Sequence, residues 1–94
     1  MGTAELNTAN LFSAESRWPE SEAHFDKAFQ IARETGNRFQ EAFALYNRGL
    51  MLKRRNLREE SRLVLLEARR MFEGLGNHAL ASECDKALSD PNHR

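Results

Sequence analysis

The fold is decided by residues 36–77, GNRFQEAFALYNRGLMLKRRNLREESRLVLLEARRMFEGLGN, a stretch that opens and closes on the same dipeptide. Gly36-Asn37 recurs forty residues later as Gly76-Asn77. The same spacing relates residues before this stretch to residues within it: Ala9 with Gly49, Ser21 with Ser61, Phe25 with Leu65, and Ala28 with Ala68. A fixed period of this size is typical of helical arrays, in which each unit buries its apolar face against its neighbours. The pattern therefore favours an interaction module over an enzyme.

Length and charge limit the possibilities further. The 94 residues are enough for one small domain, and 14 basic side chains balance 14 acidic ones. The charges are uneven, because residues 38–77 carry nine basic and five acidic groups while residues 1–37 carry three and six. The acidic ends either neutralise the basic middle, within one molecule or between copies, or the basic middle meets an acidic partner.

The chain shows no sign of secretion or membrane insertion. Cys84 is the only cysteine, so no intramolecular disulfide forms. The first twenty residues lack a signal-peptide pattern, and no stretch approaches the roughly 18 apolar residues of a membrane span. We therefore expect a soluble, cytoplasmic protein without a membrane partner, unless the chain is cut from a longer one.

Helix-capping residues and apolar periodicity predict an all-α protein with helices at about 4–15, 19–35, 38–54, 57–74 and 78–89. Pro19 suits a first helical turn, and Gly36 and Gly76 suit left-handed C-terminal caps. Asn37 and Asn56 are each followed three residues later by Gln or Glu, so we expect both to cap the next helix. Nothing in the sequence indicates a strand. The predicted core stripe of the third helix is Ala42, Leu45, Gly49 and Leu52.

The middle of the chain resembles a tetratricopeptide repeat, in particular the forty-residue form of kinesin light chains and many bacterial regulators. The residues that carry the resemblance are Gly36, Asn37, Glu41, Ala42, Ala44, Leu45, Asn47, Gly49, Glu59, Glu60, Ser61, Leu65 and Ala68. The resemblance implies a short right-handed α-solenoid of antiparallel helix pairs. It divides a single domain, 1–94, into repeat one (about 2–36), repeat two (about 37–76) and a C-terminal capping helix (about 77–90).

The resemblance also implies that the first helix of each repeat lines a concave groove for a peptide or partner helix. Helical spacing selects the side chains on that face, which we predict to bind a partner: Leu6, Asn7, Asn10, Phe43, Tyr46, Asn47, Leu50, Lys53, Arg54 and Lys86. Side-chain amides bond to an extended backbone and cations bind a carboxylate, so an acidic peptide is one candidate. The alternative is that Phe43, Tyr46 and Leu50 pack against another helix of the same chain or of a second copy.

Other functions lack a sequence signal. The three histidines and Cys84 are scattered, so we predict no metal site and no cofactor. No phosphate-binding or catalytic motif occurs, and the basic run Lys53-Arg54-Arg55 suits the end of a helix better than nucleic acid. We therefore predict a non-catalytic, protein-binding module. The alternative is a self-assembling scaffold, most simply a homodimer, or a regulatory fragment of a larger repeat protein.

Overall fold

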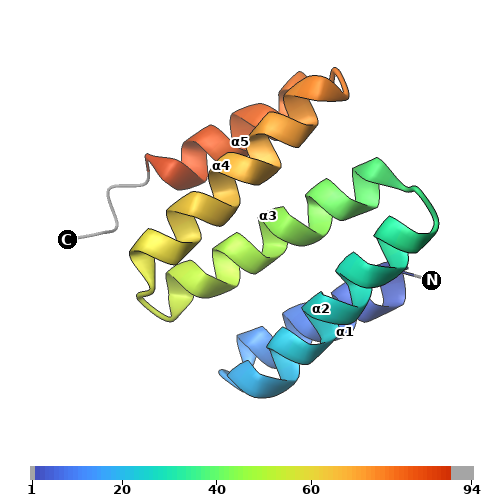
Figure 1. Ribbon diagram of the computed structural model, residues 1–94. Helices are drawn as coiled ribbons and strands as arrows, with labels where there is room; N and C mark the ends of the chain where they lie inside the picture. The colour runs from blue at the N-terminus through green and yellow to red at the C-terminus, as the bar shows by residue number, and fades with distance from the viewer. Residues whose placement is uncertain (1, 90–94) are drawn as a thin grey trace.

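The computed structural model describes the backbone of residues 2–89 and the side chains of residues 7–89. It contains five helices in this part of the chain: α1 (Gly2–Ala14), α2 (Trp18–Glu34), α3 (Arg38–Arg54), α4 (Arg58–Gly74) and α5 (His78–Leu88). Figure 1 shows α3 running between the α1–α2 pair and the α4–α5 pair. The all-α class and each predicted helix are confirmed, as is the short solenoid of antiparallel helix pairs.

The helices pack in chain order. α1 lies against α2, α3 against α4, and α5 against α4, while the contact of α2 with α3 joins the two halves. α1 also reaches α3, so the first and third helices share one side of the molecule. The result is a flat body of 39 × 32 × 17 Å. A body this thin exposes both of its broad faces.

Four similar turns connect the helices at intervals of twenty residues. Ser16, Gly36, Asn56 and Gly76 all have a positive φ, between 60° and 76°. In each turn the next N–H donates to a carbonyl five residues back, for example Asn37 N to Ala32 O and Leu57 N to Leu52 O. This is the bonding of a Schellman C-cap, which needs a residue in the left-handed conformation. Every second turn therefore uses a residue other than glycine.

The predicted N-cap of the fourth helix is wrong. Asn56 occupies the left-handed position of the turn, and Leu57 is the N-cap of α4 without a side-chain hydrogen bond. Asparagine tolerates this conformation better than most residues, because its short polar side chain bonds locally. The expected cap at Asn37 is confirmed, since its side chain accepts a hydrogen bond from Gln40 N at 3.0 Å.

Two apolar clusters form the core. The first contains Ala9, Phe25, Ala28, Ala44, Met51 and Leu52, and the second contains Ala42, Ala68, Met71, Phe72, Ala81 and Cys84. Phe43 packs against both clusters. Three residues of the predicted α3 stripe, Ala42, Gly49 and Leu52, are buried, but Leu45 is only half-buried.

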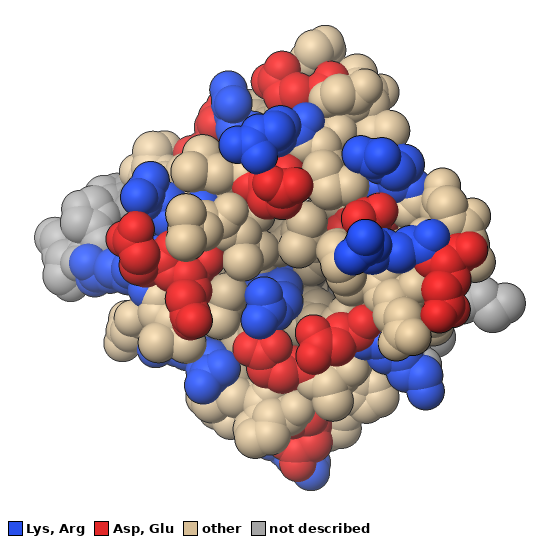
Figure 2. Space-filling view, viewed as in Figure 1, with Lys and Arg blue, Asp and Glu red and all other residues tan. Residues whose placement is uncertain are grey.

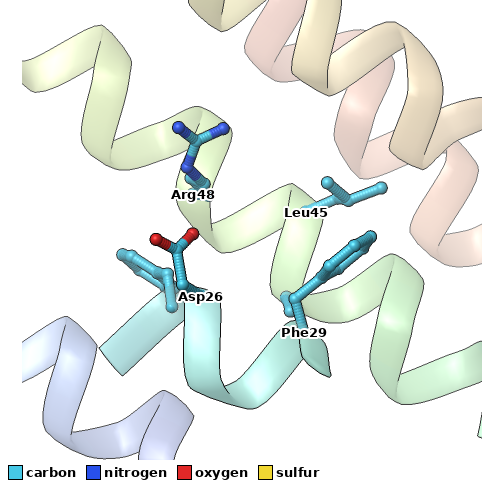
Figure 3. Close-up of a pocket in the computed structure, with 6 residues that line it drawn as sticks. Asp26, Phe29, Leu45 and Arg48 are labelled. Carbon is cyan, nitrogen blue, oxygen red and sulfur yellow. The ribbon is translucent and has the colours of Figure 1, made fainter. Parts of the chain in front are cut away.

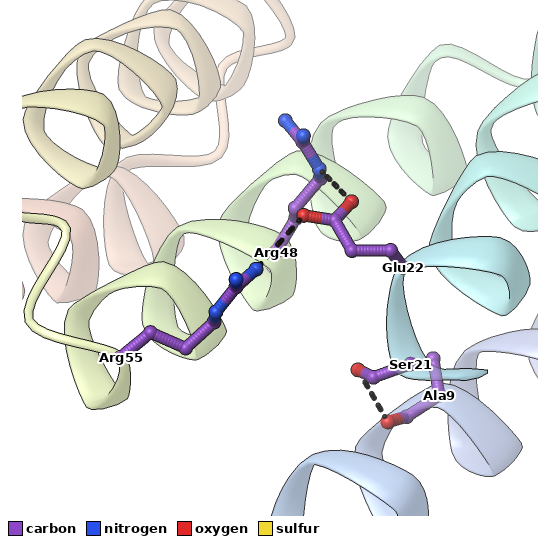
Figure 4. Close-up of polar contacts among 5 residues, drawn as sticks. All are labelled: Ala9, Ser21, Glu22, Arg48 and Arg55. Carbon is purple, nitrogen blue, oxygen red and sulfur yellow. Dashed lines mark hydrogen bonds and ion pairs between the residues drawn. The ribbon is translucent and has the colours of Figure 1, made fainter. Parts of the chain in front are cut away.

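Paired serine contacts bring the helices of each half close together. Ser21 Oγ donates to Ala9 O at 2.9 Å (Figure 4). Forty residues later, Ser61 Oγ donates to Gly49 O at 2.8 Å. A Cβ atom on Gly49 would lie 2.7 Å from side-chain atoms of Leu65. The small residue at this position therefore allows the close approach of α3 and α4.

Candidate functional site

A stripe of half-exposed side chains runs along α3. Its members are Phe39, Phe43, Tyr46, Leu50 and Lys53, spaced so that they fall on one side of the helix. The Phe39 and Phe43 rings stack with centroids 5.7 Å apart, and those of Phe43 and Tyr46 stack at 6.3 Å. We call these five residues the aromatic stripe. Sequence reasoning missed Phe39, which is 40% exposed, although it stands one helical turn before Phe43 on the same face.

Polar side chains from α1 and α3 border one edge of the stripe. Asn10 Nδ2 donates to Asn47 Oδ1 at 3.3 Å, and Asn47 Nδ2 donates to the Phe43 carbonyl at 2.9 Å. Arg54 donates to Ser13 Oγ at 3.0 Å, about one turn farther along α1 and two turns farther along α3. The structure therefore brings the predicted residues Asn10, Asn47 and Arg54 to one edge, together with Ser13.

The other edge of the stripe lies against α5. Lys53 Nζ donates to the Ala87 carbonyl at 2.7 Å. Burial and the nearby Glu83 carboxylate raise the pKa of Tyr46, so this phenol stays neutral at physiological pH. Lys86 is exposed and forms an ion pair with Glu83 at 3.4 Å. Tyr46, Lys53 and Lys86 thus belong to the α5 side.

The remaining predicted residues are less closely grouped. Asn7 is exposed on α1, and Leu50 is half-buried on α3. The side chain of Leu6 lies outside the part that the structure describes. These positions stay predictions, as does the assignment of all ten residues to a binding site.

Phe43 and Tyr46 also pack inside the protein, as the alternative interpretation required. Phe43 touches both core clusters, and Tyr46 packs against the second. Neither residue is fully buried, so each combines a packing contact with an accessible ring. Phe39 differs because it is more exposed, although the centroid of its ring lies 6.0 Å from that of Phe72.

Among the described residues, no three His, Cys, Asp or Glu side chains converge as metal ligands would. Cys84 is fully buried, and burial raises the pKa of its thiol to about 11, which keeps it protonated and unreactive near neutral pH. No helix within residues 2–89 is both long and apolar enough to cross a bilayer.

Charges on the broad face formed by α2, α3 and α4 are mixed in sign. Figure 2 shows acidic and basic side chains intermingled across the view, without a large area of one charge. Many belong to local pairs, such as Arg62 with Glu59 and Arg70 with Glu67. The basic excess of residues 38–77 therefore does not form a continuous basic surface on this face, and a nucleic-acid site needs such a surface.

Comparison with known proteins gives one match. The family model described as tetratricopeptide repeat matches residues 1–74, which covers α1 to α4. No curated protein and no solved structure gives a significant match. The match agrees with the resemblance in the sequence at the level of the family, while the kinesin-light-chain-like subtype stays a prediction.

Proposed function

Since the chain belongs to the tetratricopeptide repeat family, we propose that it is a protein-binding module that receives a partner segment along the aromatic stripe of α3. Repeats of this family are typically non-catalytic and mediate protein–protein interactions. The aromatic stripe is the observation that carries the proposal. Half-exposed aromatic side chains supply apolar contact area at low entropy cost, and aromatic residues are enriched in interface hot spots.

The borders of the stripe define the chemistry of the partner. Asn10 and Asn47 offer amide groups on one side, and the cations Lys53 and Arg54 stand at the end of the stripe. A segment with apolar side chains and a carboxylate beside them complements this arrangement. Such a segment binds either as an extended peptide or as an amphipathic helix.

The test compares Phe39→Ala with Leu63→Ala. Leu63 is also an exposed apolar residue, 57% accessible, but it lies on α4, away from the stripe. A library of short apolar peptides with and without acidic residues is screened, and the tightest binder is titrated against each variant. We expect Phe39→Ala to weaken binding by roughly tenfold, a moderate loss for an aromatic anchor, and Leu63→Ala to have no effect. Equal effects of the two variants, or no binder at all, would count against the stripe.

Asn47→Ala provides a second readout. Removing its amide should weaken binding of the same peptide, while the helical content, measured by circular dichroism, stays unchanged. Phe43→Ala is less useful for this purpose, because Phe43 packs against both core clusters and its loss lowers stability as well.

Self-association is the second candidate, and one observation favours it. Leu11 on α1 is 59% exposed, whereas Met51, its counterpart forty residues later on α3, is 1% exposed. Met51 packs in the first cluster beside α2 residues, so the same side of α1 is open for another helix. A two-fold contact between α1 helices of two copies would cover it. Analytical ultracentrifugation at micromolar concentration tests this: a dimer that Leu11→Glu dissociates supports the contact, and a monomer of about 11 kDa, the mass of one chain, excludes it.

A further inference from the structure

A small pocket between α2 and α3 is not used by the aromatic stripe. It has a volume of about 200 Å³, and its walls are Phe25, Asp26, Phe29, Ala44, Leu45 and Arg48. Figure 3 shows Asp26 and Arg48 on one side of it and Phe29 and Leu45 on the other. The pocket thus combines an apolar wall with a charged one.

The two charged side chains of the pocket, Arg48 and Asp26, differ in their interactions. Arg48 is held by Glu22, whose carboxylate lies 3.1 Å from its Nε, and Arg55 reaches the same carboxylate at 3.6 Å (Figure 4). Asp26, in contrast, has no ion pair or hydrogen bond among the residues that the structure describes. The pocket therefore offers a carboxylate with no direct hydrogen-bonding partner in the described part of the chain, next to Arg48 and an aromatic ring, and a flat cation with an apolar body can contact both the carboxylate and the ring.

The forty-residue repeat indicates which cation fits. The positions equivalent to Phe29 and Leu45 are Arg69 on α4 and Asp85 on α5, where Arg69 Nε lies 2.6 Å from Asp85 Oδ1. Between α4 and α5, these two positions thus hold a guanidinium–carboxylate pair from within the chain. Between α2 and α3, both positions hold apolar residues, and the carboxylate of the pocket comes from Asp26 instead.

We propose that the α2–α3 pocket binds the guanidinium of an arginine side chain from a partner protein, with Asp26 as the charge partner and Phe29 as the apolar wall. The planar guanidinium suits a slot between two helices and bonds to a carboxylate through two N–H groups. This site is separate from the aromatic stripe and does not depend on the proposed function. It adds a second contact point on the protein.

The experiment titrates the protein with N-acetyl-arginine methylamide and follows backbone amide signals by NMR. The matched control probe is the citrulline analogue, which has nearly the same shape and no charge. We expect saturable shifts of residues 25–29 and 44–48 with arginine, and at least about tenfold weaker binding with citrulline, the loss that removing one charge-assisted hydrogen bond predicts.

Two variants test the residues. Asp26→Asn preserves size and should weaken arginine binding roughly tenfold, whereas Asp85→Asn, which removes the carboxylate of the occupied counterpart, should leave it unchanged. The double variant Phe29→Arg with Leu45→Asp reproduces the Arg69–Asp85 pair in the α2–α3 pocket, and it should abolish the NMR shifts caused by arginine. Equal binding of citrulline and arginine, or unchanged binding by Asp26→Asn, would overturn the proposal.

Discussion

At the residue scale, single small side chains determine how closely the helices approach. Gly49 and Ala9 occupy equivalent positions, and each carbonyl accepts a hydrogen bond from the serine of the neighbouring helix. Alanine fits opposite Phe25 in the first half, whereas the second half has glycine opposite Leu65. The two halves thus solve one packing problem with different pairs of residues.

Replacing either of two helical glycines, Gly74 and Gly49, by alanine should change the free energy of unfolding, but in opposite directions. Gly74→Ala meets no atom within 4 Å, so we expect the higher helix propensity of alanine to raise the free energy of unfolding by about 0.5–1 kcal/mol. Gly49→Ala places a Cβ 2.7 Å from Leu65, so we expect a loss of about 1 kcal/mol or more from overpacking. Urea unfolding measures both. A gain at Gly49 equal to that at Gly74 would show that α3 and α4 do not depend on this contact.

Cys84 should make stability sensitive to alkaline pH. Burial raises the pKa of its thiol from 9.0 to about 11, so the unfolded chain loses this proton before the folded one does. The stabilising effect is therefore complete below about pH 9 and is lost as the pH rises toward 11. The raised pKa of Tyr46 acts in the same direction.

The matched variant is Cys84→Ala, because alanine is the residue at the equivalent position 44. Its unfolding free energy should fall less steeply between about pH 9 and pH 11, the window that the cited pKa values define. If the unfolding free energy of the variant depends on pH as steeply as that of the parent, the Cys84 thiol does not contribute to this pH dependence.

At the element scale, the repeated turns explain what the sequence could and could not reveal. Gly36 and Gly76 were recognised because glycine is the usual residue at a left-handed cap. Ser16 and Asn56 were not, because serine and asparagine are also common N-caps, and the two roles differ only by one position in the turn. The aromatic stripe was predicted only in part. Phe39 lies four residues before Phe43, so helical spacing places it on the same face, but the prediction started at Phe43. The α2–α3 pocket could not be predicted from the sequence, because its walls come from two helices whose packing only the fold shows.

Glycine at the two strained turns should stabilise the protein. Ser16 and Asn56 have φ values of 60° and 64°, and glycine adopts this conformation without a Cβ penalty. We expect Ser16→Gly to raise the free energy of unfolding by about 0.5–1 kcal/mol and Asn56→Gly by less, because asparagine already tolerates the region. Gly36→Ala is the converse control and should be destabilising. Thermal unfolding distinguishes them, and a destabilising Ser16→Gly would contradict the assigned turn.

At the scale of the whole molecule, the α2–α3 contact holds two helical halves together. Buried residues of α2 and α3 supply its apolar part by packing together in the first core cluster, and Phe43 packs against both clusters. Glu22 supplies its polar part, because Arg48 and Arg55 of α3 both approach this single α2 carboxylate (Figure 4). All three side chains are about one-third exposed or less, so water screens the pairs only partly.

Removing the shared carboxylate should loosen the two halves. In Glu22→Gln, Arg48 and Arg55 lose their common partner, and we expect the free energy of unfolding to fall by about 1 kcal/mol at low salt, with a smaller loss at high salt. Glu67→Gln is the control, because among the described residues Glu67 pairs with Arg70 of the same helix alone, and both side chains are well exposed. Its loss should stay within about 0.5 kcal/mol. Urea unfolding at two salt concentrations compares them. If both variants lose the same small amount, the charge cluster at Glu22 has no part in the coupling of the two halves, and apolar packing between α2 and α3 joins them.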